Sequence, residues 1–287
     1  MLEFYTALQQ HTFLQTAIIA ALLSSIGCGI IGPYVVVKRI AFIAGGIAHA
    51  VLGGMGAAVY YNFDPLLGAI GAAILAALLI GWVHLRWQMQ EDTLISALWA
   101  IGMAIGIIYI AKTPGNQVDL MDYLFGNILI VPTTSLYIMA ALDGLLLLLI
   151  GCYQRQFLAV VFDAEAARLR GVPVTFFYLL LLVMIALTVV LLIQVVGLIL
   201  VLALLTLPAA IAGHYVHSLG RMMILATILG GIMSIGGLMI SYTPDIPPGP
   251  TIVLLAAVLY VSSALWSQYW TRRKTQHAIS TQTNQHE

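Results

Sequence analysis

The stretch Arg39-Ile-Ala-Phe-Ile-Ala-Gly-Gly-Ile-Ala-His-Ala-Val-Leu-Gly-Gly54 decides the class of this protein. It is apolar and rich in glycine, as is typical of a helix that crosses a membrane, and it carries one imidazole, His49. A polar ring inside a bilayer costs free energy unless it has a partner, and imidazole is also a metal ligand. The stretch therefore predicts a membrane-spanning helix in which His49 either lines a substrate path or ties two helices together.

The composition of the whole chain leads to the same class. Of the 287 residues, 62% are hydrophobic and 8% are charged, whereas soluble domains carry about 25% charged residues. So few charged residues cannot cover the surface of a soluble globule of this size. We therefore expect an all-α, polytopic integral membrane protein that lies in the lipid bilayer. The formal net charge is zero and no basic patch is present, so nucleic acid is not an expected partner.

About nine transmembrane helices are expected, because a span needs about 20 apolar residues. The predicted spans are residues 12–37, 44–61, 66–85, 94–111, 134–152, 173–193, 195–213, 222–241 and 250–270. The count is eight to nine, since Gln194 and Gly197 allow either a tight hairpin or a broken helix. Segment 121–131 is too short to cross and is expected to dip into the membrane or lie flat on it. Residues 1–271 thus form one transmembrane domain, and residues 272–287 form a polar cytoplasmic tail.

The basic residues predict the orientation of the chain. With the N-terminus outside, ten of the eleven Lys and Arg side chains fall on the inner side, and only Lys112 falls outside. An excess of Lys and Arg in cytoplasmic loops is the usual pattern of membrane proteins. We therefore expect a multi-pass protein of the plasma (inner) membrane, with its N-terminus outside and its C-terminus in the cytoplasm.

Several enzyme motifs are absent from the sequence. All three lysines follow a residue other than glycine, so the chain has no P-loop, and no H-E-x-x-H or G-x-S-x-G pattern occurs. We therefore expect a transport subunit or a scaffold rather than an enzyme, with no covalently bound cofactor. Any ATP hydrolysis would belong to a separate partner chain.

Five segments carry recognisable patterns in a fixed order along the chain. One of them is Asp119-Leu-Met-Asp-Tyr-Leu-Phe-Gly-Asn-Ile-Leu129, which is close to a pattern D-L-x-x-Y-L-F-G-x-I-L. The five segments are residues 36–49, 92–106, 119–129, 162–174 and 196–210. Through them, nearly the whole chain resembles the membrane permease subunits of ABC-type zinc and manganese importers, the ABC-3 family.

The resemblance implies a function and a set of partners. It implies the permease subunit of an ATP-binding-cassette importer that moves a divalent metal ion, namely zinc, manganese or iron, into the cytoplasm. Similar proteins form a homodimer around a central path, above two cytoplasmic ATP-binding subunits, and receive metal from an extracytoplasmic metal-binding protein. Two alternatives stay open: a permease for a metal chelate such as a siderophore or corrinoid, which needs a wider pore without cation ligands, and a non-transporting membrane scaffold.

Two residues are candidate metal ligands. The resemblance implies that His49 lines the metal route. Many similar proteins carry Asp four residues before this histidine, one helical turn away, but this chain carries Gly45 there. Asp143 lies in the middle of a predicted span, where a carboxylate is costly and should be neutral or paired. The alternative for Asp143 is an interhelical hydrogen bond made by a protonated acid.

Two inner segments are candidates for coupling to an ATPase. The first contains Asp163, Glu165, Arg168 and Gly171. The second contains His214, His217 and Arg221, and the resemblance to the wider importer class implies that it holds the main coupling helix. The two histidines are three residues apart and can share a helix face, and we expect them to be interface or headgroup residues rather than metal ligands. The alternative for both segments is a solvated loop whose charges only set the topology.

Overall fold

The computed structural model describes residues 8–86, 91–113, 126, 128–244 and 246–283, and its regular elements within these ranges are all helices. The helices in chain order are α2 (Thr12–Lys38), α3 (Ala41–Tyr60), α4 (Pro65–Arg86), α5 (Glu91–Lys112), α7 (Thr133–Phe162), α8 (Ala164–Leu169), α9 (Val174–Val196), α10 (Leu198–Tyr215), α11 (Leu219–Tyr242) and α12 (Pro248–Thr283). Nine of these are long and apolar enough to cross a membrane, and α8 is the exception. The predicted all-α, polytopic fold is confirmed.

Most predicted spans agree with the helices to within a few residues, but α12 continues to Thr283 instead of ending near residue 270, and α7 is also longer than expected. The prediction ended this span at residue 152, because Gln154, Arg155 and Gln156 follow. In the structure the backbone leaves helical geometry only at Tyr153, with φ −117° and ψ 22°, and then continues as a helix to Phe162. The apolar residues that follow the polar triplet pack on the bundle, and this packing outweighs the local sequence signal.

The junction of α9 and α10 is a single residue, Gly197, with φ 81° and ψ 160°. Only glycine adopts this backbone geometry readily, so the two predicted spans are separate helices joined at this residue. Gly126 also has a positive φ, of 64°, and a Cβ there would collide with the backbone of Val196 and Gly197. Residue 126 of the segment 121–131 therefore lies against the junction, whereas residues 121–125 and 127 are outside the described part of the chain.

Close contact between helices depends on glycine in the α3–α5 pair. A Cβ at Gly53 would lie 2.9 Å from the carbonyl oxygen of Gly102, and one at Gly56 would lie 2.6 Å from that of Gly106. A Cβ at Gly46 would collide with the side chain of Ile95. Small residues let helix backbones approach in lipid, where burial of apolar side chains adds little driving force.

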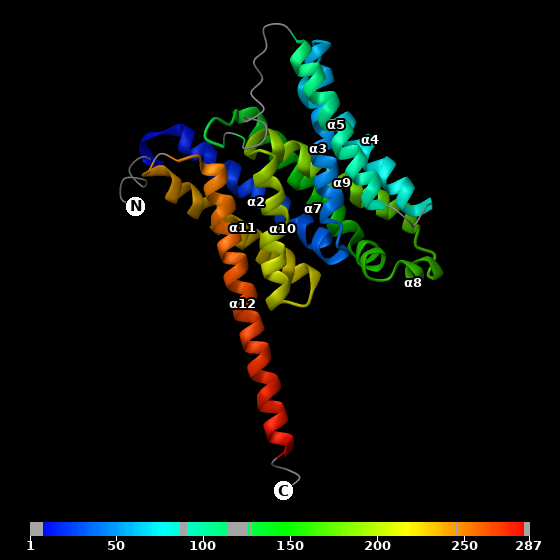
Figure 1. Ribbon diagram of the computed structural model, residues 1–287, viewed down its shortest axis with the longest axis vertical. Helices are drawn as coiled ribbons and strands as arrows, with labels where there is room; N and C mark the ends of the chain where they lie inside the picture. Colours follow the sequence, from blue (N-terminus) through cyan, green and yellow to red (C-terminus); the bar gives the residue numbers. More distant parts are fainter. Residues whose placement is uncertain (1–7, 87–90, 114–125, 127, 245, 284–287) are drawn as a thin grey trace.

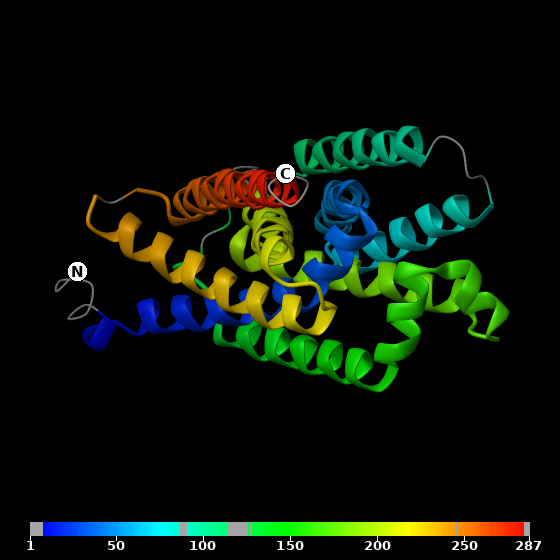
Figure 2. The same cartoon turned by 90° about the horizontal axis from the view of Figure 1, so that it is seen from below.

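The two ends of the bundle differ. Figure 1 shows α8, the α2–α3 turn and the α10–α11 turn at one end, and α12 continues beyond the bundle at this same end. Figure 2, which shows the molecule from below, places α5 (teal) at the edge of the bundle. The 36 residues of α12 make a helix about 54 Å long, longer than the hydrocarbon core of about 30 Å.

We predict that Gly56→Ala destabilises the protein by roughly 1–3 kcal/mol, because the new Cβ meets backbone atoms that cannot move aside. The thermal unfolding midpoint of the protein in detergent should fall accordingly. Gly71→Ala is the matched control, since a Cβ at Gly71 meets no atom within 4 Å. An equal midpoint for both variants would contradict the role given to the glycine contact.

Candidate functional site

His49 lies on α3, eight residues after Ala41 and thus about 12 Å along the helix. Its ring stacks on Trp99 of α5, with ring centroids 4.0 Å apart and planes 11° from parallel. The glycine contacts between α3 and α5 bring the two rings this close. Stacking uses the faces of the imidazole, so both ring nitrogens at its edge remain suitable for binding a metal ion.

Trp99 is itself held in place by its own helix and by α3. Its Nε1 donates a hydrogen bond to Sδ of Met103, at 3.2 Å. The ring of Phe42 lies 6.3 Å from the ring of Trp99 between centroids. His49 is therefore half-buried beside the aromatic rings of Trp99 and Phe42, and packing against Trp99 fixes its position.

Gly45 precedes His49 by one helical turn on α3. It is buried, yet a Cβ at this position would meet no atom within 4 Å. Packing therefore does not require glycine here, in contrast to Gly46 next to it. The family resemblance led us to expect a carboxylate at this position. This chain has glycine there, although the surrounding structure leaves space for a side chain.

Asp143 lies on α7 in the seam with α2 and is only 6% exposed. Its Oδ1 is 2.8 Å from the point where a Cβ on Gly27 of α2 would lie, so the carboxyl group fills the space above this glycine. Its Oδ2 is buried and has no hydrogen-bond partner. The nearby hydroxyl of Thr188 donates to the carbonyl of Met184 in its own helix, at 2.8 Å.

The two candidate ligands belong to different helix pairs. His49 lies in the α3–α5 contact, and Asp143 lies in the α2–α7 contact. Across the described ranges, no group of three or more His, Cys, Asp or Glu side chains is placed to hold a metal ion. The structure thus does not gather the sequence-predicted ligands into one site within a single chain.

The first inner segment folds as the six-residue helix α8 with ordinary helix-end chemistry. Asp163 is the N-cap, and its Oδ1 accepts a hydrogen bond from the Ala166 amide at 2.9 Å. Glu165 lies in the first turn and Arg168 in the last, which suits the helix dipole. Gly171, with φ 78°, ends the segment. All four predicted residues are exposed.

Exposed apolar side chains accompany α8, and the sequence reading missed them. Leu169 is 90% exposed, and Phe162 just before α8 is 64% exposed. Their exposure could not be read from the sequence, because apolar residues nearby, such as Val161 and Ala167, are buried.

The second inner segment is not one helix. Pro208 lies inside α10, which ends at Tyr215, and Val216 is extended with φ −128° and ψ 141°. His214 is therefore on α10, whereas His217 lies in the turn before α11 and Arg221 lies in the first turn of α11. The expected shared helix face of the two histidines is not formed, because the chain leaves helical geometry between them.

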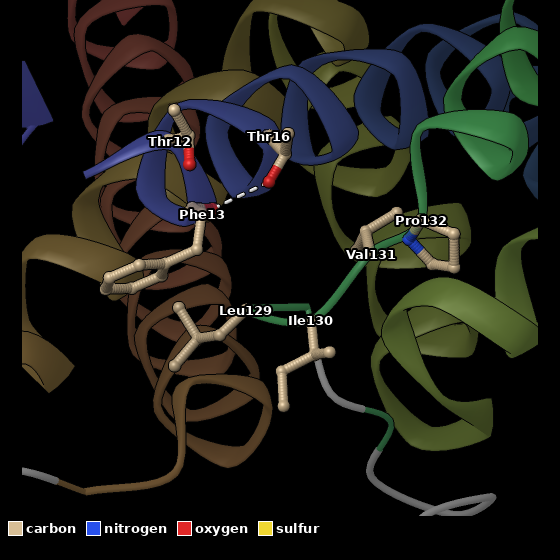
Figure 3. Close-up of a pocket in the computed structure, with 7 residues that line it drawn as sticks. All are labelled: Thr12, Phe13, Thr16, Leu129, Ile130, Val131 and Pro132. Atoms are coloured by element: carbon tan, nitrogen blue, oxygen red, sulfur yellow. Dashed lines mark hydrogen bonds between the residues drawn. The ribbon is translucent and has the colours of Figure 1, made fainter.

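A pocket of about 500 Å³ at the start of α2 contains no metal ligand (Figure 3). Its lining consists of Thr12, Phe13, Thr16, Leu129, Ile130, Val131 and Pro132. The hydroxyl of Thr16 donates to the carbonyl of Phe13 at 2.8 Å. The described lining residues include no imidazole, carboxylate or thiolate, which are the usual ligands of divalent transition metals.

Comparison with known proteins gives the family. The model of the ABC 3 transport family matches residues 10–267, which is most of the chain. The chain therefore belongs to the ABC 3 transport family, as its sequence segments predicted. It is the membrane permease of an ABC transporter and not itself an enzyme.

Individual relatives cover nearly the full length. A "Probable metal transport system membrane protein" of Chlamydia trachomatis is 43% identical over 87% of this chain and 87% of its own length. The "Manganese import system permease protein ScaB" of Streptococcus parasanguinis is 35% identical over 97% of this chain and 98% of its own length. The solved structure of PsaBC from Streptococcus pneumoniae in complex with Fab matches with a TM-score of 0.82 and 36% identity, over 91% of this chain and 94% of that chain.

We predict that Gly45→Asp creates a stronger metal site, because the new carboxylate would lie one turn from His49 in open space. A ligand that binds only the folded state stabilises it. Added Mn²⁺ should therefore raise the unfolding midpoint of Gly45→Asp by several degrees more than that of the unchanged protein. Gly45→Asn has the same size without the charge and should show the smaller shift. Equal shifts for the two variants would show that the space at Gly45 does not face His49.

Proposed function

We propose that this chain is the membrane-spanning subunit of an importer that moves a divalent metal ion into the cytoplasm, with manganese as its main cargo. The full-length similarity to permeases named for metal and manganese transport carries this proposal. The absence of a P-loop from the sequence fits a permease that works with separate ATP-binding subunits. An extracytoplasmic metal-binding protein would deliver the ion.

His49 is the residue that we place on the metal path. It is half-buried on a glycine-packed helix pair, and its ring is held by Trp99 while its nitrogens stay at the ring edge. A transport site must release its ion, so a site with few protein ligands is suitable. A metal chelate brings its own ligands and would not need this imidazole, so a role for His49 favours a free ion over a siderophore or corrinoid.

Asp143 fits the role of a packing acid better than that of a ligand. It lies in a tight seam against Gly27, and among the described residues no cationic side chain neutralises its charge. A carboxyl group without a cation in such a place is expected to be neutral. We therefore assign the metal path to His49 and the α2–α7 contact to Asp143.

A homodimer completes the path in this proposal. Of the nine spanning helices in the described ranges, α5 is the least buried, although it carries the Trp99 side of the candidate site. Its exposed face contains the small residues Ser96, Ala100 and Ala104 at four-residue spacing. Such spacing is typical of close helix–helix contacts in lipid, so a second copy packing on α5 would enclose the region beside His49.

The inner end of the bundle is where we place the ATP-binding subunits. The basic residues put this end in the cytoplasm and the N-terminus outside. Here α8 offers an exposed surface that combines charge, from Glu165 and Arg168, with an apolar contact at Leu169. This combination fits a protein partner better than a solvated loop, so α8 is our first candidate for the coupling contact, in place of the second inner segment, which is divided between α10 and α11.

The function is tested by uptake into proteoliposomes that hold the permease with its ATP-binding subunits. Mn²⁺ should accumulate in an ATP-dependent way, and His49→Ala should lower the rate by roughly tenfold or more, since one lost ligand costs on the order of 1.4 kcal/mol or more of ion binding. Asp143→Asn keeps the shape of a neutral acid and should retain most of the uptake. Normal uptake by His49→Ala would remove this residue from the path, and loss of uptake by a well-folded Asp143→Asn would restore Asp143 as a ligand.

Coupling is tested on α8 with variants that keep its fold. Glu165→Lys should lower the amount of Mn²⁺ moved per ATP hydrolysed, because it reverses a charge on the proposed contact. Asp163 is unsuitable for reversal, since loss of its N-cap costs about 1 kcal/mol by itself. Asp163→Asn keeps the cap, removes the charge and serves as the milder comparison. An unchanged ratio of Mn²⁺ moved to ATP hydrolysed in Glu165→Lys would mean that the charges of α8 only set the membrane topology.

A further inference from the structure

Two histidines line one groove at the inner end of the bundle. The groove has a volume of about 420 Å³ and lies where α2, α7, α10, α11 and α12 meet. Its lining includes His214 and His217 together with Val36, Phe162, Met222 and Tyr260. Arg221 is not part of the lining. The groove is far along the chain from His49 and contains none of the residues that we place on the metal path.

A short chain of hydrogen-bonding groups holds the ring of His214 in place. Nδ1 of His214 lies 3.3 Å from Oγ of Ser263 on α12. The Ser263 hydroxyl donates its proton to Oη of Tyr215, at 3.1 Å. With the Ser263 hydroxyl used as a donor to Tyr215, the lone pairs of Ser263 Oγ are available to accept a hydrogen bond from Nδ1 of His214. In the neutral ring, Nε2 then carries the free lone pair.

This arrangement is the one that metal-binding histidines use. Such a histidine commonly donates the hydrogen of one ring nitrogen to a nearby oxygen, which fixes the ring and leaves the other nitrogen for the metal. Tyr260 adds to the restraint, because its ring lies 6.1 Å from that of His214 at an angle of 25°. His217 is exposed in the adjacent turn and lines the same groove.

We propose that Nε2 of His214 and the imidazole of His217 bind a divalent metal ion in this groove, and that the bound ion slows transport. Water would complete the coordination, since only two protein ligands are present. A site with so few ligands binds weakly, so it fills only when the metal concentration on that side is high. Because the groove opens at the inner end, it would report the concentration of metal that has already entered. The inhibitory role rests on the proposed import function, whereas the binding site does not.

The binding site is tested with Zn²⁺ as the probe, because imidazole binds Zn²⁺ more tightly than Mn²⁺. Calorimetric titrations of the permease in detergent would use a His49→Ala/His277→Asn/His286→Asn background, so that neither the proposed metal path nor the tail histidines contribute. His214→Ala and His217→Ala should each remove the groove site, with a loss of affinity of roughly tenfold or more. Ser263→Ala should weaken binding by about tenfold, as is usual when the partner of a metal-binding histidine is lost.

Ser262→Ala is the matched control for Ser263→Ala. The Ser262 hydroxyl donates to the carbonyl of Leu259 in its own helix at 2.9 Å, so its loss should leave Zn²⁺ affinity unchanged. Equal Zn²⁺ affinity in the background protein, His214→Ala and His217→Ala would overturn the site. A loss in Ser262→Ala as large as that in Ser263→Ala would overturn the orienting role of Ser263.

The inhibitory role is tested with the complete transporter in proteoliposomes. Mn²⁺ added on the side that receives ATP should slow ATP-driven uptake, with each variant compared with its own rate without this addition. The His214→Ala/His217→Ala double variant should need roughly tenfold more Mn²⁺ on that side for the same inhibition. Equal sensitivity of the two proteins would overturn the inhibitory role, whereas absence of uptake by the unchanged protein would count against the proposed import function instead.

Discussion

Direct contact of helix backbones at glycine is the constraint on which this bundle depends. Lipid tails are as apolar as leucine side chains, so helices in a bilayer gain little by hiding apolar surface from their surroundings, and close packing must hold them together. Gly53 and Gly56 on α3 meet Gly102 and Gly106 on α5 with no room for a Cβ. The same approach brings His49 against Trp99, so the position of this histidine is a consequence of the packing.

Neighbouring glycines in this bundle have different physical roles. Gly46 is required because Ile95 occupies the space next to it, whereas Gly45 has empty space around its missing Cβ. Gly197 is required by its backbone geometry at the junction of α9 and α10, and the contact with Gly126 follows from that junction. Gly27 provides the space that the carboxyl group of Asp143 fills. A glycine-rich membrane sequence therefore combines packing, backbone and cavity positions that look identical in the sequence.

The end of the bundle that carries α8 and the α10–α11 turn shows how tertiary contacts change the roles of polar residues. Asp163, Glu165 and Arg168 stabilise the two ends of α8, so their charges alone do not indicate a partner. The exposed Leu169 beside them is an equally strong reason to expect a contact there. The spacing of His214 and His217 allows them to share a helix face, but the helix ends before Val216 and the two residues do not share one. A contact with Ser263 on α12, 49 residues away, then orients the ring of His214. Spacing along the chain could not predict this contact, because it joins two helices that are distant in the sequence.

The sequence by itself determined the membrane class, the spans to within a count of eight to nine, the family and the position of His49 in the second span. These features depend on local properties: the length of apolar runs, the distribution of Lys and Arg, and motifs within single segments. The tertiary structure alone decided that His49 stacks on Trp99, that Gly45 has open space, and that Asp143 lies in another seam with Oδ2 unpaired. It also decided that α7 continues beyond its polar triplet. These outcomes depend on which helices meet and at what distance, and helix contacts in lipid are set by shape complementarity between segments that are far apart in the chain.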